Sequence, residues 1–283
     1  MPFIFFVWVL GLESVLLAVG LVIFYSFKGQ NLLDWKFDRQ ICKDLLRDTW
    51  PVIISGIAIA VYMRIDQIMI KGMLDAAAVG YYSAAVRISE VFYFLPAIIT
   101  GSVFPAIIKS KLEDEVRYNK RLLALFTILL WSAIGASIFF TLLAKPIVLT
   151  LFGAEYSPAI PVLMVHTWGS LFVFLGVVRT KWAINENYQI YIMFYVILGA
   201  VINVVLNLIF IPRTGIIGAA FSTVIAQFVA AMLSNLCCSQ TRPIFLLQIR
   251  SFNPNELRSA WRTLKNNLKS KKVQMPDSRE LIV

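Results

Sequence analysis

Charged side chains inside apolar stretches are the residues of this sequence whose types and spacing could do chemistry. They are Glu13, Arg64, Asp66, Arg87 and Glu90. A charge at the centre of a bilayer costs about 2.5 to 3.5 kcal/mol on insertion scales, and such groups usually face a bundle interior or a water-filled cavity. The arginines could attract an anionic substrate, and the carboxylates could balance that charge or respond to a coupling ion.

The two arginines are expected at one depth in the membrane. The sequence predicts helices over 51–70 and 80–108, which would form a hairpin across a short turn. Arg64 and Arg87 each lie seven residues from that turn, or about 10 Å at 1.5 Å per residue. They should therefore share a level in the outer half of the bilayer.

The carboxylates lie near that level. Asp66 should be about half a turn shallower than Arg64, and Glu90 almost one turn deeper than Arg87 on the same helix face. Two cations and two carboxylates at similar depth could line a cavity that accepts an anionic head group. The alternative is a buried ion-pair cluster that only fixes helix packing.

Other polar groups point to packing rather than catalysis. His166 could exchange protons near neutral pH, but a single imidazole among apolar neighbours is more often a hydrogen-bonded packing residue. Asn203 and Asn207 share one helix face, which favours interhelical hydrogen bonds. The sequence holds no Ser/His/Asp arrangement, HExxH, CxxC or phosphate loop. We therefore expect no enzymatic activity, no catalytic metal and no cofactor.

The elements that must position these residues are transmembrane helices. The 283 residues are 59% apolar and 15% charged, whereas soluble domains carry about 25% charged residues. Stretches of roughly 20 apolar residues, enough to cross a bilayer, recur along the chain. The sequence thus predicts an all-α, polytopic membrane bundle of about seven helices, at 3–27, 51–70, 80–108, 122–144, 159–180, 190–211 and 216–238.

The distribution of basic residues predicts the orientation. The net charge of +10 could suggest nucleic acid. Most Lys and Arg residues, however, fall in 28–47, in 109–121 and after 241, which the positive-inside rule places in the cytoplasm. The opposite side keeps only Lys71, Lys145 and Arg213. We expect a multi-pass protein with a cytoplasmic C-terminus and no nucleic-acid partner.

Local signals refine the expected helices. Thr49 could cap the helix at 51–70, with Pro51 in its first turn. Pro96 and Pro105 should each bend the helix at 80–108. The helix at 3–27 has no basic segment before it and no small-residue cleavage site, so we expect an internal helix of a longer protein rather than a signal peptide.

An ordered set of motifs over roughly residues 1–240 resembles the Wzx polysaccharide flippases of the multidrug/oligosaccharidyl-lipid/polysaccharide exporter superfamily. The motifs are RIDQIMI, VGYYSAAVRISE, LFGAEYSPAIPVLMVHTW, NVVLNLIFIP and TGIIGAAFSTVIAQ. The resemblance implies a two-lobed, MATE-like transporter with a central cavity. It implies the last helix of a first lobe at 1–27, a cytoplasmic linker at 28–50, a six-helix second lobe at 51–240 and a basic cytoplasmic tail at 241–283.

The resemblance also implies a cargo and a location. The cargo would be undecaprenyl diphosphate-linked oligosaccharide, moved across the bacterial inner membrane for O-antigen or capsule synthesis. Arg64 and Arg87 would attract the diphosphate or acidic sugars, and Asp66 and Glu90 would balance them or respond to coupling ions. Glu13 is a weaker candidate for the same balancing or coupling role.

Most of a first lobe has no counterpart in the sequence, and several interpretations stay open. A first-lobe polypeptide or a second copy could complete the cavity, or the chain could be an inactive fragment. A cation-coupled multidrug exporter of the same superfamily should favour carboxylates over arginines in its cavity. A membrane polymerase should have a large outer loop, whereas the longest expected here is 145–158.

Overall fold

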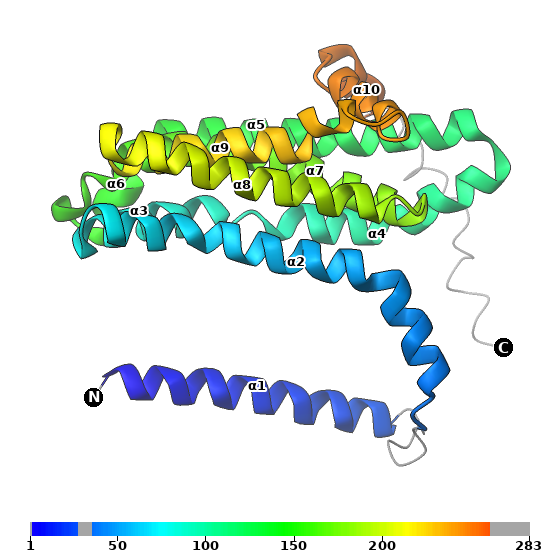
Figure 1. Ribbon diagram of the computed structural model, residues 1–283, viewed down its shortest axis with the longest axis horizontal. Helices are drawn as coiled ribbons and strands as arrows, with labels where there is room; N and C mark the ends of the chain where they lie inside the picture. Colours follow the sequence, from blue (N-terminus) through cyan, green and yellow to red (C-terminus); the bar gives the residue numbers. More distant parts are fainter. Residues whose placement is uncertain (1, 28–35, 261–283) are drawn as a thin grey trace, which may run out of the picture. The chain divides into compact units, whose positions relative to one another are not determined.

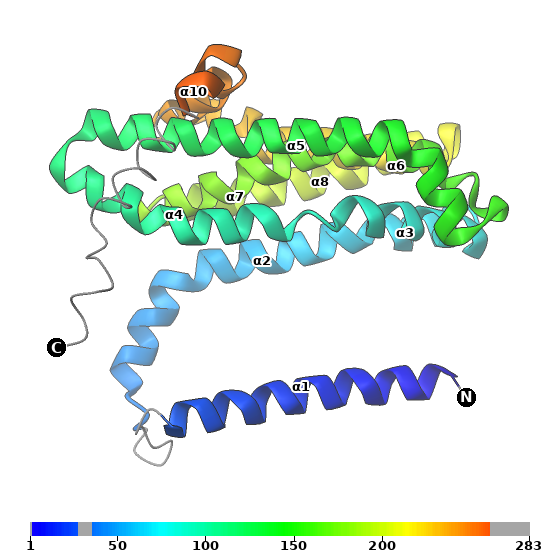
Figure 2. The same cartoon turned by 180° about the vertical axis from the view of Figure 1, so that it is seen from behind.

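The computed structural model describes residues 2–27 and 36–260, and every regular element in these ranges is a helix. Figures 1 and 2 show the helices from opposite sides. The chain divides into two compact units, Met1–Trp50 and Pro51–Val283. Six described helices are long and apolar enough to cross a membrane, and Gly11–Phe27 forms a shorter apolar helix. The prediction of an all-α membrane bundle of about seven helices is confirmed.

The first unit contains α1, Pro2–Phe27, and the beginning of α2, Arg39–Met73. The described apolar side chains of α1 lie exposed, Leu12 and Leu16 among them. A helix with apolar side chains around its surface requires an apolar solvent, because water would make this exposure costly. This observation agrees with a transmembrane position for α1.

The second unit contains the remaining helices. They are α3 (Ala76–Glu90), α4 (Phe94–Glu113), α5 (Glu115–Phe152), α6 (Ala159–His166), α7 (Ser170–Asn185), α8 (Gln189–Thr214), α9 (Ile216–Ala231) and α10 (Arg242–Ser251). Three short 3₁₀ helices, Ala154–Tyr156, Thr167–Gly169 and Leu233–Leu236, join some of them. The helix expected at 159–180 is thus α6 and α7 with a 3₁₀ turn between them.

The predicted beginning of the second helix was wrong. α2 begins at Arg39, and Pro51 lies inside it. Asp38 supplies the N-terminal cap, since its Oδ1 accepts hydrogen bonds from the backbone N–H groups of Gln40 and Ile41 at 2.8 and 3.1 Å. The Thr49 hydroxyl instead donates to a backbone carbonyl of the preceding turn, so it caps nothing.

The single helix expected over 80–108 is two helices. α3 ends at Glu90, and α4 begins at Phe94, two residues before Pro96. The predicted bend at Pro96 is therefore a break, and its position fits the tolerance for proline in a first helical turn. Pro105 lies inside α4. Asp75 caps α3 by accepting a hydrogen bond of 2.7 Å from the Ala78 N–H.

The core of the second unit gathers around α5. This helix contacts α4, α6, α7 and α10, and it buries Leu122, Phe126, Leu129 and Leu130 completely. Its contact with α10 includes a 3.2 Å hydrogen bond from the Trp131 indole N–H to the carbonyl of Ser251. The expected tail at 241–283 is thus helical and packed over its first part. The rest of this tail, from residue 261, lies outside the described residues.

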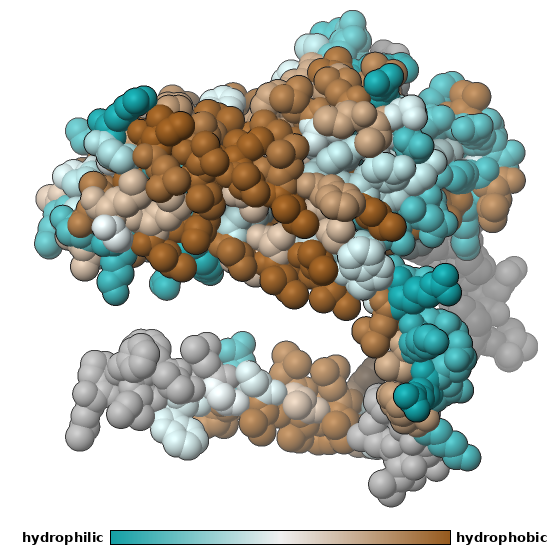
Figure 3. Space-filling model, viewed as in Figure 1, coloured by the Kyte–Doolittle hydropathy of each residue, from teal (hydrophilic) through white to brown (hydrophobic). Residues whose placement is uncertain are grey.

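Small residues bring α8 and α9 together. A Cβ atom added to Gly199 of α8 would lie 2.6 Å from the Cβ of Ala230 of α9, closer than side-chain atoms approach. Ala219 and Ala220 are also fully buried in α9. Such close backbone approach is typical of membrane helix pairs. Figure 3 shows a broad hydrophobic surface over this side of the second unit, which agrees with contact with lipid.

Candidate polar site between four helices

A buried carboxylate joins four helices of the second unit. Asp66 of α2 is only 2% exposed. Its Oδ1 accepts a hydrogen bond of 2.6 Å from the Asn207 amide of α8. Its Oδ2 accepts hydrogen bonds from the hydroxyls of Tyr82 of α3, at 2.7 Å, and Thr223 of α9, at 2.5 Å. All three donors are neutral side chains.

A second asparagine extends this polar cluster. The Asn203 amide donates to the Thr223 hydroxyl at 3.4 Å, and the Asn207 amide also approaches the Asn203 carbonyl oxygen at 3.3 Å. Both asparagines are fully buried, and the Oδ1 atom of Asn207 has no hydrogen-bond partner. The predicted interhelical hydrogen bonds of the two asparagines are confirmed. We refer to Asp66, Tyr82, Asn203, Asn207 and Thr223 as the Asp66 cluster.

His166 lies beside the Asp66 cluster as a packing residue. Its Nδ1 forms a 2.7 Å hydrogen bond with the Ser89 hydroxyl, and its ring meets that of Tyr82 edge-on at 6.2 Å. The hydrogen-bonded packing interpretation from the sequence describes this geometry. The imidazole thus supports the ring of Tyr82, whose hydroxyl reaches Asp66.

The Asp66 cluster can hold a small cation or a proton. It presents carboxylate, amide and hydroxyl oxygens, which are ligands for hard cations. A buried carboxylate without a cationic partner is costly, so binding a cation or proton would relieve that cost. In the described residues no group of three or more His, Cys, Asp and Glu side chains could hold a metal. A single negative charge therefore suits a monovalent ion best.

The two predicted arginines lie apart from Asp66. Arg64 and Arg87 are exposed, whereas Asp66 is buried. Residues two apart point about 200° apart around a helix of 3.6 residues per turn, so Arg64 faces away from Asp66. Within residues 2–27 and 36–260, neither arginine forms an ion pair within 4.0 Å. The structure thus leaves these guanidinium groups accessible to an anion.

Glu90 and Glu13 have different surroundings. Glu90 is half-buried, and the positive charge of Arg64 acts on it from beyond ion-pair distance. Glu13 is exposed on α1, in the first unit. The four charges near the α2–α3 turn therefore do not form one ion-pair cluster: Asp66 bonds to neutral donors, and Glu90 is near a cation.

Comparisons with known proteins agree with this fold and add a family. Residues 4–111 match the family described as polysaccharide biosynthesis protein. The chain is 29% identical over 192 residues to a Haloferax volcanii protein named "Probable flippase AglR", covering 61% of this chain and 37% of that relative. The fold resembles an outward-facing multidrug resistance MATE family transporter of the MOP superfamily, with TM-score 0.60, 18% identity, and 77% and 50% of the two chains covered.

Together these matches support a polysaccharide flippase of the multidrug/oligosaccharidyl-lipid/polysaccharide exporter (MOP) superfamily. The fold of this chain also resembles the lipid II flippase MurJ in an inward closed conformation, with TM-score 0.57, 18% identity, and 77% and 48% of the two chains covered. The fold also resembles a Pyrococcus furiosus transporter of the MOP superfamily. The TM-score is 0.58 and the identity 16%, with 73% of this chain and 51% of that chain covered. The resemblance to polysaccharide flippases found in the sequence motifs is confirmed.

This chain spans only part of the length of the proteins that it resembles. It covers 37% of the curated relative and about half of the three solved structures. The solved structures are all less than 20% identical, so they establish the fold and not the cargo. The helices that carry Arg64, Asp66 and Arg87 lie within the family match over 4–111.

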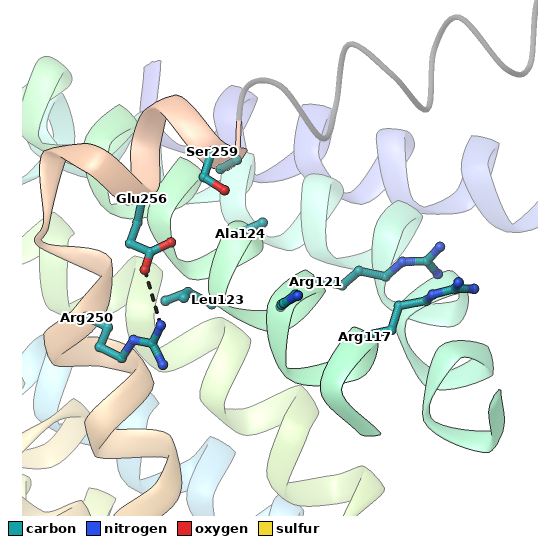
Figure 4. A pocket seen from close by; sticks show the side chains of 9 residues that line it. Arg117, Arg121, Leu123, Ala124, Arg250, Glu256 and Ser259 are labelled. Carbon is teal, nitrogen blue, oxygen red and sulfur yellow. Dashed lines mark hydrogen bonds and ion pairs between the residues drawn. The ribbon is translucent and has the colours of Figure 1, made fainter. Parts of the chain in front are cut away.

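The sequence analysis did not predict two further features of the chain. Arg179 is buried inside α7 and lines a cavity. A second, surface pocket of about 680 Å³ lies where α5 meets α10 (Figure 4). Its basic residues are Arg117, Lys120, Arg121 and Arg250, and Glu256 pairs with Arg250 at 3.3 Å. Such a basic surface can attract anionic lipid head groups.

Proposed function

We propose that the chain is part of a flippase that moves undecaprenyl diphosphate-linked oligosaccharide across the bacterial inner membrane for surface polysaccharide synthesis, either O-antigen or capsule. The observation that carries the proposal is the pair Arg64 and Arg87, exposed at membrane depth without a carboxylate within ion-pair distance among the described residues. A diphosphate is a partner for such cations. The family match and the name of the Haloferax relative support the polysaccharide assignment.

The Asp66 cluster is proposed as the site of the coupling ion. It joins α2, α3, α8 and α9 through one carboxylate, so a bound cation or proton would change the hydrogen bonds of all four helices. Secondary transporters couple an ion site near the membrane midplane to rocking of helices around it. Glu90 would balance Arg64, and Glu13 keeps its proposed balancing role on α1.

The proposed arrangement has residues 1–27 as the last helix of a first lobe, 28–50 as a cytoplasmic linker, 51–240 as the second lobe and 241–283 as a cytoplasmic tail. The concentration of basic residues on one side supports this orientation. A first-lobe polypeptide or a second copy would complete the cavity. A multidrug exporter is less well supported, because the accessible charges at depth include two arginines.

Complementation tests the proposal. The 283-residue chain is expressed in a bacterium that lacks its flippase, alone and together with a first-lobe polypeptide, and surface glycan is measured with membrane abundance as the control. Restored glycan in either case supports the proposal. Absence of glycan from both, at normal abundance of each polypeptide, would contradict it.

A further inference from the structure

A cavity of about 320 Å³ lies inside the second unit, apart from the carboxylate of Asp66. Residues from α2, α7, α8 and α9 line it, together with Tyr93 between α3 and α4. Most of its wall is apolar, with Met63, Phe172 and Val177 as examples, and Tyr62, Tyr93 and Gln227 add hydroxyl and amide groups. Its size is at the lower end of the range for small-molecule sites.

A buried arginine faces this cavity without a compensating carboxylate. Arg179 is 2% exposed, and its Nη1 donates to the carbonyl of Ala230 near the end of α9. Its Nε is buried and has no hydrogen-bond partner. Among the described residues no carboxylate lies within the 4.0 Å ion-pair distance of its guanidinium group.

The buried positive charge of Arg179 would be stabilised by a bound anion. A guanidinium stays protonated in proteins, and a buried charge without a partner is strongly unfavourable. One backbone carbonyl satisfies one of its five N–H donors and does not neutralise it. Lys181, exposed at the same cavity, adds a second cation. Arginine with lysine is a common combination for binding phosphate.

The apolar wall and the depth of Arg179 indicate an amphiphilic ligand. Arg179 lies six residues before Asn185, where α7 ends, which is about 9 Å at 1.5 Å per residue. That depth is close to the boundary between lipid head groups and hydrocarbon. An anion alone would leave the apolar wall unused, whereas a lipid can place its phosphate at the arginine and its chain along the wall.

We propose that this cavity binds the phosphate group of a membrane lipid, with Arg179 at the phosphate and Lys181 at the outer side of the cavity. Two lipids share this chemistry: the polyprenyl carrier of the proposed cargo, and a bilayer phospholipid. The proposal concerns binding within the second unit and holds whether or not the chain transports a glycan.

Native mass spectrometry of the purified full-length chain tests the proposal. Undecaprenyl phosphate and phosphatidylglycerol are titrated separately, and diacylglycerol serves as the lipid without phosphate. At least one phosphate lipid should bind, and Arg179→Gln should weaken that binding by about tenfold or more. Arg213→Gln, which removes an exposed arginine at the end of α8, should leave it within about twofold.

A second variant keeps the arginine and fills the cavity. A Cβ atom at Gly176 would lie 3.5 Å from the Cβ of Ala231, an ordinary contact, so Gly176→Leu should fold and occupy the cavity. Gly176→Leu should also reduce lipid binding. If Arg179→Gln does not fold, the binding measured with Gly176→Leu tests whether the cavity is the lipid site. Equal binding by the wild type and Gly176→Leu, or no preference of the wild type for either phosphate lipid over diacylglycerol, would overturn the proposal and leave Arg179 as a cap of α9.

Binding by undecaprenyl phosphate would identify the carrier lipid as the ligand, and binding by phosphatidylglycerol would identify a bilayer phospholipid. Either result supports the proposal if it depends on Arg179 and on an open cavity. Because this experiment measures binding and not transport, lipid binding can be absent while complementation restores surface glycan. Lipid binding can likewise be present while complementation fails.

Discussion

The hydroxyl of Tyr82 donates a 2.7 Å hydrogen bond to the carboxylate of Asp66, and so fixes α3 to α2 inside the membrane-spanning bundle. Asn207 and Thr223 bring α8 and α9 to the same carboxylate. One buried charge therefore links four helices through neutral donors. Stability and ion response should both depend on this carboxylate.

Asp66→Asn should abolish the response of the protein to its coupling cation. The variant keeps the shape of the side chain but removes the negative charge that would attract a cation or proton. We expect the wild-type melting temperature in detergent to change with sodium, compared with choline, or with pH, because a ligand that binds the folded state stabilises it. Asp66→Asn should respond to neither, and a response equal to that of the wild type would remove Asp66 from the proposed ion site.

Tyr82→Phe should lower the stability of the bundle. It removes one of three donors to a buried carboxylate, and hydrogen bonds to charged groups contribute about 1.5 to 3 kcal/mol. Tyr81→Phe is the matched control, because Tyr81 is partly exposed and packs edge-on against the ring of Tyr156. Thermal unfolding of both variants checks the prediction. Equal melting temperatures for the two would show that the Tyr82 hydroxyl contributes nothing.

Arg64→Ala and Arg87→Ala should abolish surface glycan when introduced into a flippase that complements, with little change in abundance. Both side chains are exposed, and exposed substitutions usually change stability by less than about 0.5 kcal/mol. Arg213→Ala should retain the glycan, since Arg213 lies exposed at the end of α8 and belongs to neither of the two helices that carry Arg64 and Arg87. Loss of glycan in proportion to loss of protein would instead assign both arginines to folding.

Gly199→Ala should destabilise the α8–α9 pair by about 1 to 3 kcal/mol, because its new methyl group would meet the Cβ of Ala230 at 2.6 Å. Gly135→Ala in α5 is the matched control, since no atom lies within 4 Å of the added Cβ and alanine favours a helix. The two variants are compared by their melting temperatures in detergent. A Gly199→Ala variant as stable as Gly135→Ala would mean that the two helices separate at no cost.

The sequence predicted the helices well because twenty-residue apolar stretches can satisfy their backbone in a bilayer only as helices. It did less well at their ends. The residues that begin α2 at Arg39 belong to a polar segment, so the apolar pattern began only at 51. Asp38 was the signal that could have found the true beginning, since aspartate is a preferred N-cap.

The site was predicted only in part. Helical depth predicts that Arg64 and Asp66 lie near one level, but depth does not tell which helix face is buried, and Asp66 is buried whereas Arg64 is exposed. Because Arg64 and Asp66 are two residues apart, their side chains point about 200° apart around the helix, and this spacing could already have placed them on different faces. Thr223 and Tyr82 could not be assigned to Asp66 from the sequence, because they are 157 and 16 residues away and meet it only through helix packing.

The most direct test of the account measures movement of the cargo itself. Proteoliposomes that contain the chain with a first-lobe partner are loaded with fluorescent undecaprenyl diphosphate-linked oligosaccharide, and lectin access to the glycan reports its leaflet. We expect the labelled glycan to change leaflet faster than in protein-free vesicles, and Arg87→Ala to return the rate to that of the vesicles alone. Equal rates with and without the wild-type protein, at verified reconstitution of both polypeptides, would contradict the proposed flippase.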